Sequence, residues 1–248
     1  MVQSHLFGRT FLPIDCEEYF QNGTKHNGVY TIYPAGEDSA MEVYCDMGCT
    51  ENEDHEGGQW TVIQRREDGS VNFHRPWGDY KEGFGNKSGE YWLGLQNIYL
   101  LTWGHKYELK VEMEDFEGGK VFALYSSFAV ESEDEGYRLR VMDFNDGGAG
   151  DSLQHQNGAR FSAFDRDQDN IYVNCADYHR GGFWFNQCYY YYYYYYYYFV
   201  GSSPNGDYKW KDYNNGYDGV IWGTWKGTYY SLKSITMKIK RVPLPEVD

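Results

Sequence analysis

The sequence predicts a loop-rich α+β or mostly β domain, and three observations lead to this fold class. The chain has 248 residues, which is enough for one large domain with a substantial core, and no linker-like stretch divides it. Aromatic residues make up 20% of the chain, and 29 glycines allow frequent turns between aromatic-rich strands. Several segments alternate between apolar and polar residues, which is typical of strands with one buried face.

The elements are expected in an order that begins with a small N-terminal unit. Residues 1–13 show no periodicity and are expected to form an extended leader, followed by one domain over 14–242 and a tail over 243–248. The N-terminal unit is predicted to hold a helix at 16–21 and strands at 28–33 and 41–46. Further strands are predicted at 59–66, 106–115, 120–130, 137–144 and 229–241, and helices at 77–83 and 95–102.

Regular structure is expected to be sparse between residues 145 and 230. The glycine-rich turn at 145–152 is not a phosphate loop, because no Gly-Lys-Ser/Thr ending follows it. An irregular region of this length is usually either functional or disordered. A bound ion and a disulfide would give it a reason to be ordered.

Charge and composition argue against several classes of function. The formal net charge of −15 disfavours nucleic acid and anionic membrane surfaces as partners. No apolar run approaches the roughly 18 residues of a membrane-spanning helix, and residues 1–12 carry no pattern of an export signal. The seven histidines are scattered without a zinc-binding spacing, and no nucleophile stands beside a base. We therefore expect a binding protein rather than an enzyme.

The stretch 165–188 carries the clearest functional pattern. Carboxylates stand at every second position, at Asp165, Asp167 and Asp169. Together with backbone carbonyls of a bent chain, they are the hard oxygen ligands that Ca²⁺ prefers. The Gly and Glu of a helix-loop-helix calcium site are missing, since Asn170 and Ala176 occupy those positions. We interpret the stretch as a calcium loop, with a solvated acidic turn as the alternative.

Ordered matches along the chain resemble the fibrinogen-related domains. They cover about residue 14 to residue 242, and this dispersed order is more specific than any single motif. The matches are Gly28-Val29-Tyr30, Val43-Tyr44-Cys45-Asp46-Met47, the segments 58–66 and 89–95, Gly182-Phe183-Trp184-Phe185 before Cys188, and Tyr230-Ser231-Leu232-Lys233. Four further segments, 107–109, 114–116, 147–153 and 161–169, resemble a matrix-associated branch of the family.

The resemblance implies an architecture and a set of site residues. It implies a disulfide-stapled N-terminal subdomain, a central antiparallel sheet and a calcium-binding C-terminal region. The implied calcium ligands are the carboxylates of Asp167 and Asp169 and the carbonyls of Ile171 and Val173, while Asp165 orients the loop. The implied disulfides are Cys16–Cys45 and Cys175–Cys188, and a cis peptide bond is implied at Gln187–Cys188. Cys49 is left over, either for an intermolecular bridge or as a buried or free thiol.

Related lectin-like members bind acetyl groups of sugars in a pocket beside the calcium site. Here Tyr178 and His179 stand at the corresponding positions, and Trp184, Tyr208 and Tyr217 surround the candidate pocket in sequence, where each is either a ligand contact or part of the core. The pattern departs from the family, because His179 stands where acetyl-binding members have tyrosine. Tyr189 to Tyr198 form an uninterrupted run inside an insertion at 189–199. Such a run could form an aromatic platform for sugars, or it could be a low-complexity expansion with a tendency to aggregate.

These observations predict a secreted recognition domain. Two glycosylation sequons, at Asn22 and Asn86, fit a secreted surface. The first hypothesis is a calcium-stabilised domain that binds acetylated or other glycans as a homo-oligomer. The alternatives are an extracellular-matrix protein that binds elastin or collagen, and a receptor ligand of the angiopoietin-like type.

Overall fold

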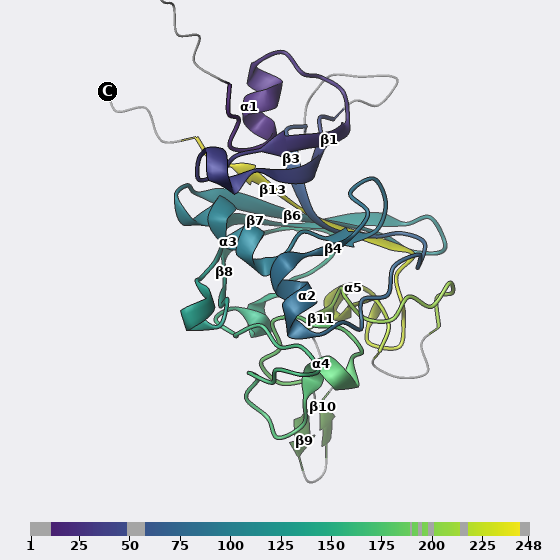
Figure 1. Ribbon diagram of the computed structural model, residues 1–248. Coiled ribbons are helices and arrows are strands. Elements are labelled where there is room, and N and C mark those ends of the chain that lie inside the picture. The colour runs from purple at the N-terminus through teal and green to yellow at the C-terminus, as the bar shows by residue number, and fades with distance from the viewer. Residues whose placement is uncertain are drawn as a thin grey trace, which may run out of the picture.

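The computed structural model describes residues 11–48, 58–188, 190–192, 195–197, 201–213 and 218–243. Its central strands are β1 (Gly28–Ile32), β2 (Met41–Asp46), β3 (Trp60–Arg66), β4 (Phe84–Gly85), β5 (Tyr91–Trp92), β6 (Tyr107–Glu114), β7 (Lys120–Val130), β8 (Leu139–Gly147) and β13 (Ser234–Arg241). They form one nine-stranded antiparallel sheet in the order β1-β2-β3-β13-β6-β7-β8, with β4 and β5 paired beside β3 (Figure 1). This confirms the predicted central antiparallel sheet.

The helices are short. They are α1 (Cys16–Gln21), α2 (Trp77–Glu82), α3 (Leu95–Trp103), α4 (Cys175–Tyr178) and α5 (Gly223–Lys226), with 3₁₀ turns η1 (Glu37–Ser39), η2 (Glu133–Glu135) and η3 (Gln154–Gln156). In Figure 1, α2 and α3 lie in front of the sheet. The small strands β9 (Tyr190–Tyr192), β10 (Tyr195–Tyr197), β11 (Ser202–Ser203) and β12 (Ile221–Trp222) pair in two separate ribbons.

The N-terminal unit is attached to the sheet by covalent and polar contacts. A disulfide joins Cys16 of α1 to Cys45 of β2, as the resemblance implied. Asp15 caps α1 by accepting the N–H of Glu18 at 3.1 Å, which satisfies one of the helix's free N-terminal donors. Its other oxygen accepts the hydroxyl of Tyr107 in β6 at 2.8 Å, so the cap also fixes α1 to the sheet.

The two faces of the sheet differ in polarity. Along β6, every second residue from Tyr107 to Met113 is buried, and these side chains join a core rich in aromatic residues. Trp92, Phe161 and Trp184 form part of that core, with ring centroids 5.3–5.9 Å apart. Such offset and edge-to-face pairs contribute about 0.5–1.5 kcal/mol each beyond the burial of their area.

Most predicted elements are confirmed, and two strands differ from prediction in their bounds. β13 begins at Ser234 rather than at residue 229, because the backbone of Ser231 and Leu232 bonds instead to Asp212 and Val220. β8 runs from Leu139 to Gly147 rather than over 137–144, since its ladder with β7 starts only at the pair of Leu139 and Val130. Tyr137 has a positive φ of 49° and lies outside the ladder.

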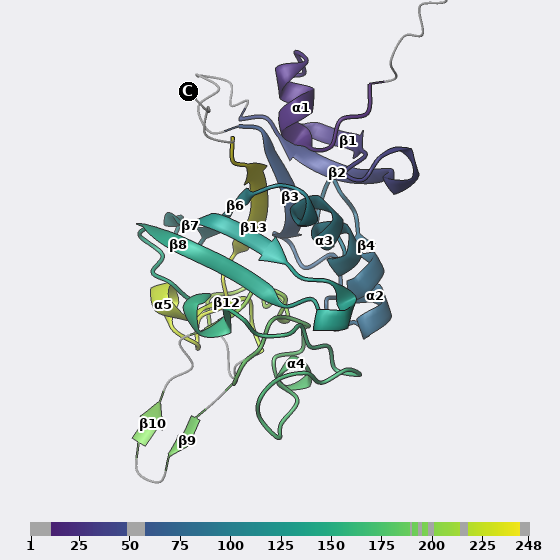
Figure 2. The same ribbon diagram turned by 90° about the vertical axis from the view of Figure 1, so that its left-hand side faces the viewer.

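The C-terminal region is loop-rich, as expected. Figures 1 and 2 place α4 at the end of the molecule opposite α1. Two parts of the tyrosine run, Tyr190–Tyr192 and Tyr195–Tyr197, pair as the antiparallel strands β9 and β10, which project away from the body in Figure 2. Within the described residues, these two strands pair only with each other.

Candidate functional site

The predicted calcium loop bends around its own aspartates. Asp167 Oδ1 accepts the N–H of Asp169 at 3.2 Å, and Asp169 accepts the N–H groups of Ile171 and Cys175, each at 2.9 Å. The two carboxylates are therefore held next to each other on one tight turn. Among the hydrogen bonds between described residues, none is donated to the carbonyl of Ile171 or Val173, which leaves both oxygens available as ligands.

The electrostatics of this turn fit a cation. Burial and the charge of Asp167 raise the pKa of Asp169 to about 6, even though two backbone N–H groups lower it. This means that the folded loop disfavours two adjacent carboxylate charges, and a bound divalent ion would relieve the repulsion. Within the described ranges, no group of three or more His, Cys, Asp and Glu side chains is placed to hold a metal. A calcium site here would therefore combine two carboxylates with backbone carbonyls, which is the predicted ligand set.

Asp165 makes a contact away from the turn of Asp167 and Asp169, and its role in orienting the loop stays a prediction. Its Oδ1 accepts the N–H of Trp77, the first residue of α2, at 2.7 Å. The carboxylate therefore connects the start of the loop to a helix 88 residues earlier in the chain.

The far side of the loop is fixed by amides and by a disulfide. Asn170 donates two hydrogen bonds to Asn186, from its N–H to the carbonyl at 2.9 Å and from its Nδ2 to Oδ1 at 2.5 Å. Asn174 caps α4 by accepting the N–H of Asp177. The predicted disulfide between Cys175 and Cys188 is present, and closing this short loop contributes about 3 kcal/mol on a chain-entropy model.

The candidate pocket residues fall into distinct environments. Tyr178 is 41% exposed beside the loop, and burial together with Tyr229 and Asp218 raises the pKa of its phenol. His179 is fully buried beneath it, stacked on Phe185 with ring centroids 5.0 Å apart. The structure therefore brings Tyr178 and His179 together at one end of α4.

Trp184 and Tyr208 lie in the core rather than at the surface. Trp184 is fully buried and donates its Nε1–H to the carbonyl of Tyr137 at 2.7 Å. Tyr208 is 9% exposed, and its hydroxyl contacts the carbonyls of Glu67 and Lys233. Neither ring is offered to a ligand at the surface. Tyr217 lies outside the described residues.

Two further expectations concern the backbone and the cysteines. The described residues contain no cis peptide bond, so the cis bond expected at Gln187–Cys188 is wrong for this structure. The trans form of a non-proline peptide is favoured by about 2.5–4 kcal/mol. Cys49 lies outside the described residues.

Both glycosylation sequons are on the surface. Asn22 is exposed at the end of α1, where its Nδ2 donates to the carbonyl of Glu18. Asn86 is exposed in the turn between β4 and β5, and its Oδ1 accepts the N–H of Ser88. Their glycosylation stays a prediction.

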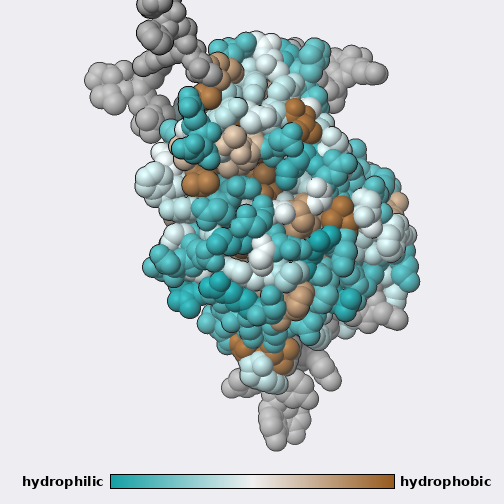
Figure 3. All heavy atoms as spheres, viewed as in Figure 1, coloured by the Kyte–Doolittle hydropathy of each residue, from teal (hydrophilic) through white to brown (hydrophobic). Residues whose placement is uncertain are grey.

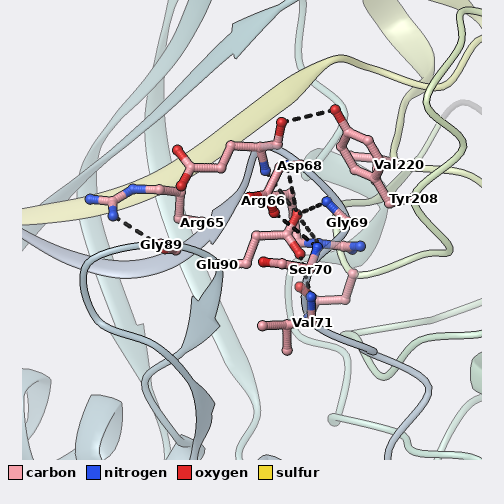
Figure 4. Close-up of polar contacts among 12 residues, drawn as sticks. Arg65, Arg66, Asp68, Gly69, Ser70, Val71, Gly89, Glu90, Tyr208 and Val220 are labelled. Carbon is pink, nitrogen blue, oxygen red and sulfur yellow. Dashed lines mark hydrogen bonds and ion pairs between the residues drawn. The ribbon is translucent and has the colours of Figure 1, made fainter.

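A buried carboxylate that sequence reasoning missed organises the turn after β3. Glu90 is fully buried and lies 3.5 Å from Arg66 Nε in an ion pair (Figure 4). Its two oxygens accept four backbone N–H groups at 2.9–3.2 Å, from Glu67, Asp68, Gly69 and Val71. Because the partners are 19 to 23 residues from Glu90, no local motif pointed to them.

Arg66 links this turn to the C-terminal region. Its Nη1 donates to the carbonyls of Pro204 and Gly206, at 3.3 and 2.6 Å. Nearby, Arg180 and Lys209 pair with Asp207, at 3.1 and 3.5 Å, which ties the end of α4 to the same segment. The irregular region is thus ordered by polar contacts that converge on residues 204–209.

The surface itself is mostly polar. On the face shown in Figure 3, hydrophobic residues occur as separate spots rather than as one continuous patch. No helix among the described residues is long and apolar enough to cross a membrane.

Comparisons with known proteins agree with this architecture. Residues 12–242 match the family described as fibrinogen beta and gamma chains, C-terminal globular domain. The chain is 47% identical over 235 residues to microfibril-associated glycoprotein 4 of Bos taurus, covering 93% of this chain and 86% of that protein. It is also 47% identical over 230 residues to angiopoietin-related protein 2 of Mus musculus, covering 92% of this chain and 43% of that protein.

A solved structure shows the same fold. The fibrinogen-like globe domain of human ANGPTL2 aligns with a TM-score of 0.83 and 42% identity, over 93% of this chain and 100% of that one. The similarity to microfibril-associated glycoprotein 4 confirms the resemblance to a matrix-associated branch that segments 107–109, 114–116, 147–153 and 161–169 indicated.

Proposed function

The chain belongs to the family of fibrinogen C-terminal globular domains, and we propose that it is a secreted, calcium-stabilised recognition domain for acetylated or other glycans. Members of this family are binding proteins without enzymatic activity. The observation that carries the proposal is the turn of Asp167 and Asp169 beside the carbonyls of Ile171 and Val173, which accept no hydrogen bond from the described residues. A bound calcium ion would neutralise the paired carboxylates and hold the loop beside Tyr178.

The ligand surface follows from the exposed groups around this loop. Tyr178 offers an aromatic ring and a hydroxyl, the combination with which tyrosine contacts sugars, and His179 and Phe185 support it from below. A single shallow site of this kind binds weakly. We therefore include a homo-oligomer in the proposal, because multivalency raises avidity without new contacts.

A matrix role is the second candidate, and the comparisons favour it. Relatives at 47% identity over most of this chain are named microfibril-associated glycoprotein 4, which suggests elastic fibres, elastin or collagen as partners here. The similarity to angiopoietin-related protein 2 likewise makes a receptor-ligand role an alternative.

One experiment tests calcium and glycan binding together. The protein is passed over an N-acetylated resin in calcium and eluted with chelator, while its melting temperature is measured with and without calcium. We expect retention, chelator elution and a calcium-dependent rise in melting temperature. Asp167→Ala removes a ligand, so it should flow through and melt in calcium as the parent does in chelator.

The control is Asp134→Ala, which removes an exposed carboxylate in η2 outside the loop. It should behave like the parent protein in both measurements. A calcium-dependent thermal gain retained by Asp167→Ala would disprove the ligand assignment. Calcium-independent retention on elastic fibres, with no binding to the acetylated resin, would favour the matrix role instead.

A further inference from the structure

We propose that Arg166 is a positioning residue for calcium, held by Trp77 and Glu133 so that the ligand turn after it keeps its shape. This inference rests on the proposed calcium site and names a residue outside its ligand set. Arg166 stands between Asp165 and Asp167, so it directly precedes the first proposed calcium ligand in the sequence.

We call the contacts that Asp165 and Arg166 make with Trp77, together with the ion pair of Arg166 and Glu133, the clamp. Its first part is formed on Trp77. The N-cap residue of α2 is Pro76, which offers no side-chain hydrogen bond, and Asp165 Oδ1 accepts the Trp77 N–H in its place at 2.7 Å. The next residue, Arg166, lays its guanidinium over the Trp77 ring, 4.0 Å from the ring centroid. Two consecutive loop residues therefore hold one tryptophan by its backbone and by its ring.

Trp77 is itself a fixed anchor. Its side chain is 9% exposed and packs against Tyr137 and Phe161, with ring centroids 5.8 and 6.3 Å apart. Both partners belong to the core, so the clamp holds the loop in a fixed position relative to the core.

The second part of the clamp is an ion-pair chain. Arg166 Nη1 lies 3.5 Å from Glu133 Oε1, and the other oxygen of Glu133 lies 2.7 Å from Lys81 Nζ on α2. Arg166 is thus joined to α2 through both the tryptophan and the lysine. A planar guanidinium can lie flat on the indole ring while its N–H groups pair with Glu133, and the compact ammonium group of lysine has no such flat face.

The residues on either side of Asp167 are also fixed through their backbones. Arg166 and Ala163 exchange both backbone hydrogen bonds at 3.0 Å. Gln168 donates its N–H to Ser162 Oγ at 2.9 Å and its Nε2–H to the carbonyl of Phe161 at 2.7 Å. Asp167 is therefore presented from a turn whose two flanks are tied to the core.

The charge of Arg166 and its clamp contacts predict opposite changes in calcium affinity when Arg166 is replaced. As a positive charge beside a cation site, Arg166 repels calcium, so its removal would tighten binding if charge were its only effect. As a clamp, it pre-orders the carboxylates, so its removal weakens binding. Loss of a residue that orients metal ligands typically weakens affinity by about 10–100-fold.

The test is a calorimetric titration of the intact protein with calcium chloride. We expect Arg166→Gln to raise the dissociation constant about tenfold, and Arg166→Lys to raise it too, because lysine keeps the charge but not the stack. Melting temperatures in chelator should stay close to the parent value, since the clamp pairs are partly exposed. Arg140→Gln is the matched control, because it removes one arginine from an exposed pair with Glu131 and should leave the dissociation constant unchanged.

Unchanged or tighter calcium binding by Arg166→Gln would overturn the clamp. If the parent binds calcium and Asp167→Ala does not, the proposed site stands, and unchanged or tighter binding by Arg166→Gln rules out the clamp alone. If the parent takes up no calcium, the proposed site and the clamp both fail. Should Arg166→Gln fold poorly, Arg166→Lys and Glu133→Gln decide the question, since each breaks one part of the clamp.

Discussion

At the scale of single residues, Glu90 connects several separate segments of the fold. Its buried carboxylate accepts four backbone N–H groups and faces Arg66, which in turn donates to the carbonyls of Pro204 and Gly206. Removing one partner of a buried ion pair leaves the other charge without compensation, which costs more than the pair itself contributes.

We predict that Glu90→Gln lowers the free energy of unfolding by about 3–5 kcal/mol, as in other broken buried pairs. Urea denaturation at neutral pH measures this change in the free energy of unfolding. Glu114→Gln serves as the control, because Glu114 pairs with Lys233 and Lys120 at the surface and should lose at most about 1 kcal/mol. Similar losses in both variants would show that the Glu90 network contributes no more than a surface pair.

Glu112 makes stability depend on pH. Burial alone would raise the pKa of Glu112, but Lys238 and Lys110, whose Nζ atoms lie 2.7 and 2.8 Å away, hold it below its ordinary value. A carboxylate with a lowered pKa in the folded state stabilises the protein above its unfolded pKa. That contribution disappears as the pH falls through the folded pKa.

Glu112→Gln should therefore cost about 0.5–1 kcal/mol at pH 7, where the parent pair is charged and partly exposed. The difference from the parent should shrink at an acidic pH below the lowered folded-state pKa of Glu112, where the parent carboxylate is protonated as well. Urea denaturation at the two pH values measures both. Glu42→Gln, on the exposed side of β2, should show no such pH dependence, and a loss of equal size at both pH values would contradict the assignment.

Single residues also show where sequence reasoning stops. The disulfides Cys16–Cys45 and Cys175–Cys188 could be predicted because the family resemblance implies them, whereas the role of Asp167 and Asp169 as calcium ligands stays a prediction. Glu90 and Arg66 could not be predicted, because their contacts join segments that are up to 140 residues apart. The burial of Trp184 and Tyr208 was also hidden, since an aromatic residue near a pocket in sequence can point either way.

At the scale of elements, the β9–β10 hairpin stands apart from the rest of the fold. Its strands pair only with each other within the described part of the chain, and they project from the body in Figure 2. An uncharged run of ten tyrosines without Pro or Gly is a typical aggregation-prone segment.

We predict that replacing residues 189–199 with a short Gly-Ser linker changes the free energy of unfolding by less than about 0.5 kcal/mol, as for surface changes remote from the core. Solubility, measured by light scattering against concentration, should rise. A clear loss of stability would mean that the run packs against the domain. An equally long linker serves as a control for the length of the loop.

Element length explains which strands the sequence revealed. β6 alternates apolar and charged residues over eight positions, which is enough for a clear period, and β7 is a long run of eleven residues. β4, β5, β11 and β12 have two residues each, and α4 and α5 have four, so none of them is long enough to show its period more than about once. Their order comes from tertiary contacts instead.

At the scale of the whole molecule, the sheet separates two disulfide-stapled ends. Cys16–Cys45 lies in the N-terminal unit and Cys175–Cys188 lies beside the calcium loop, at the opposite end in Figure 1. Copies joined through their N-terminal units would therefore leave the proposed recognition surface exposed. This arrangement suits a multivalent binding protein.

The position of β13 has a consequence for biosynthesis. This strand comes from the end of the described chain, yet it pairs with both β3 and β6 in the middle of the sheet. A nascent polypeptide therefore lacks this middle strand until residues 234–241 have been synthesised, and β3 and β6 present open edges until then. Open strand edges favour wrong pairing, so the domain can complete its sheet only after β13 has been inserted.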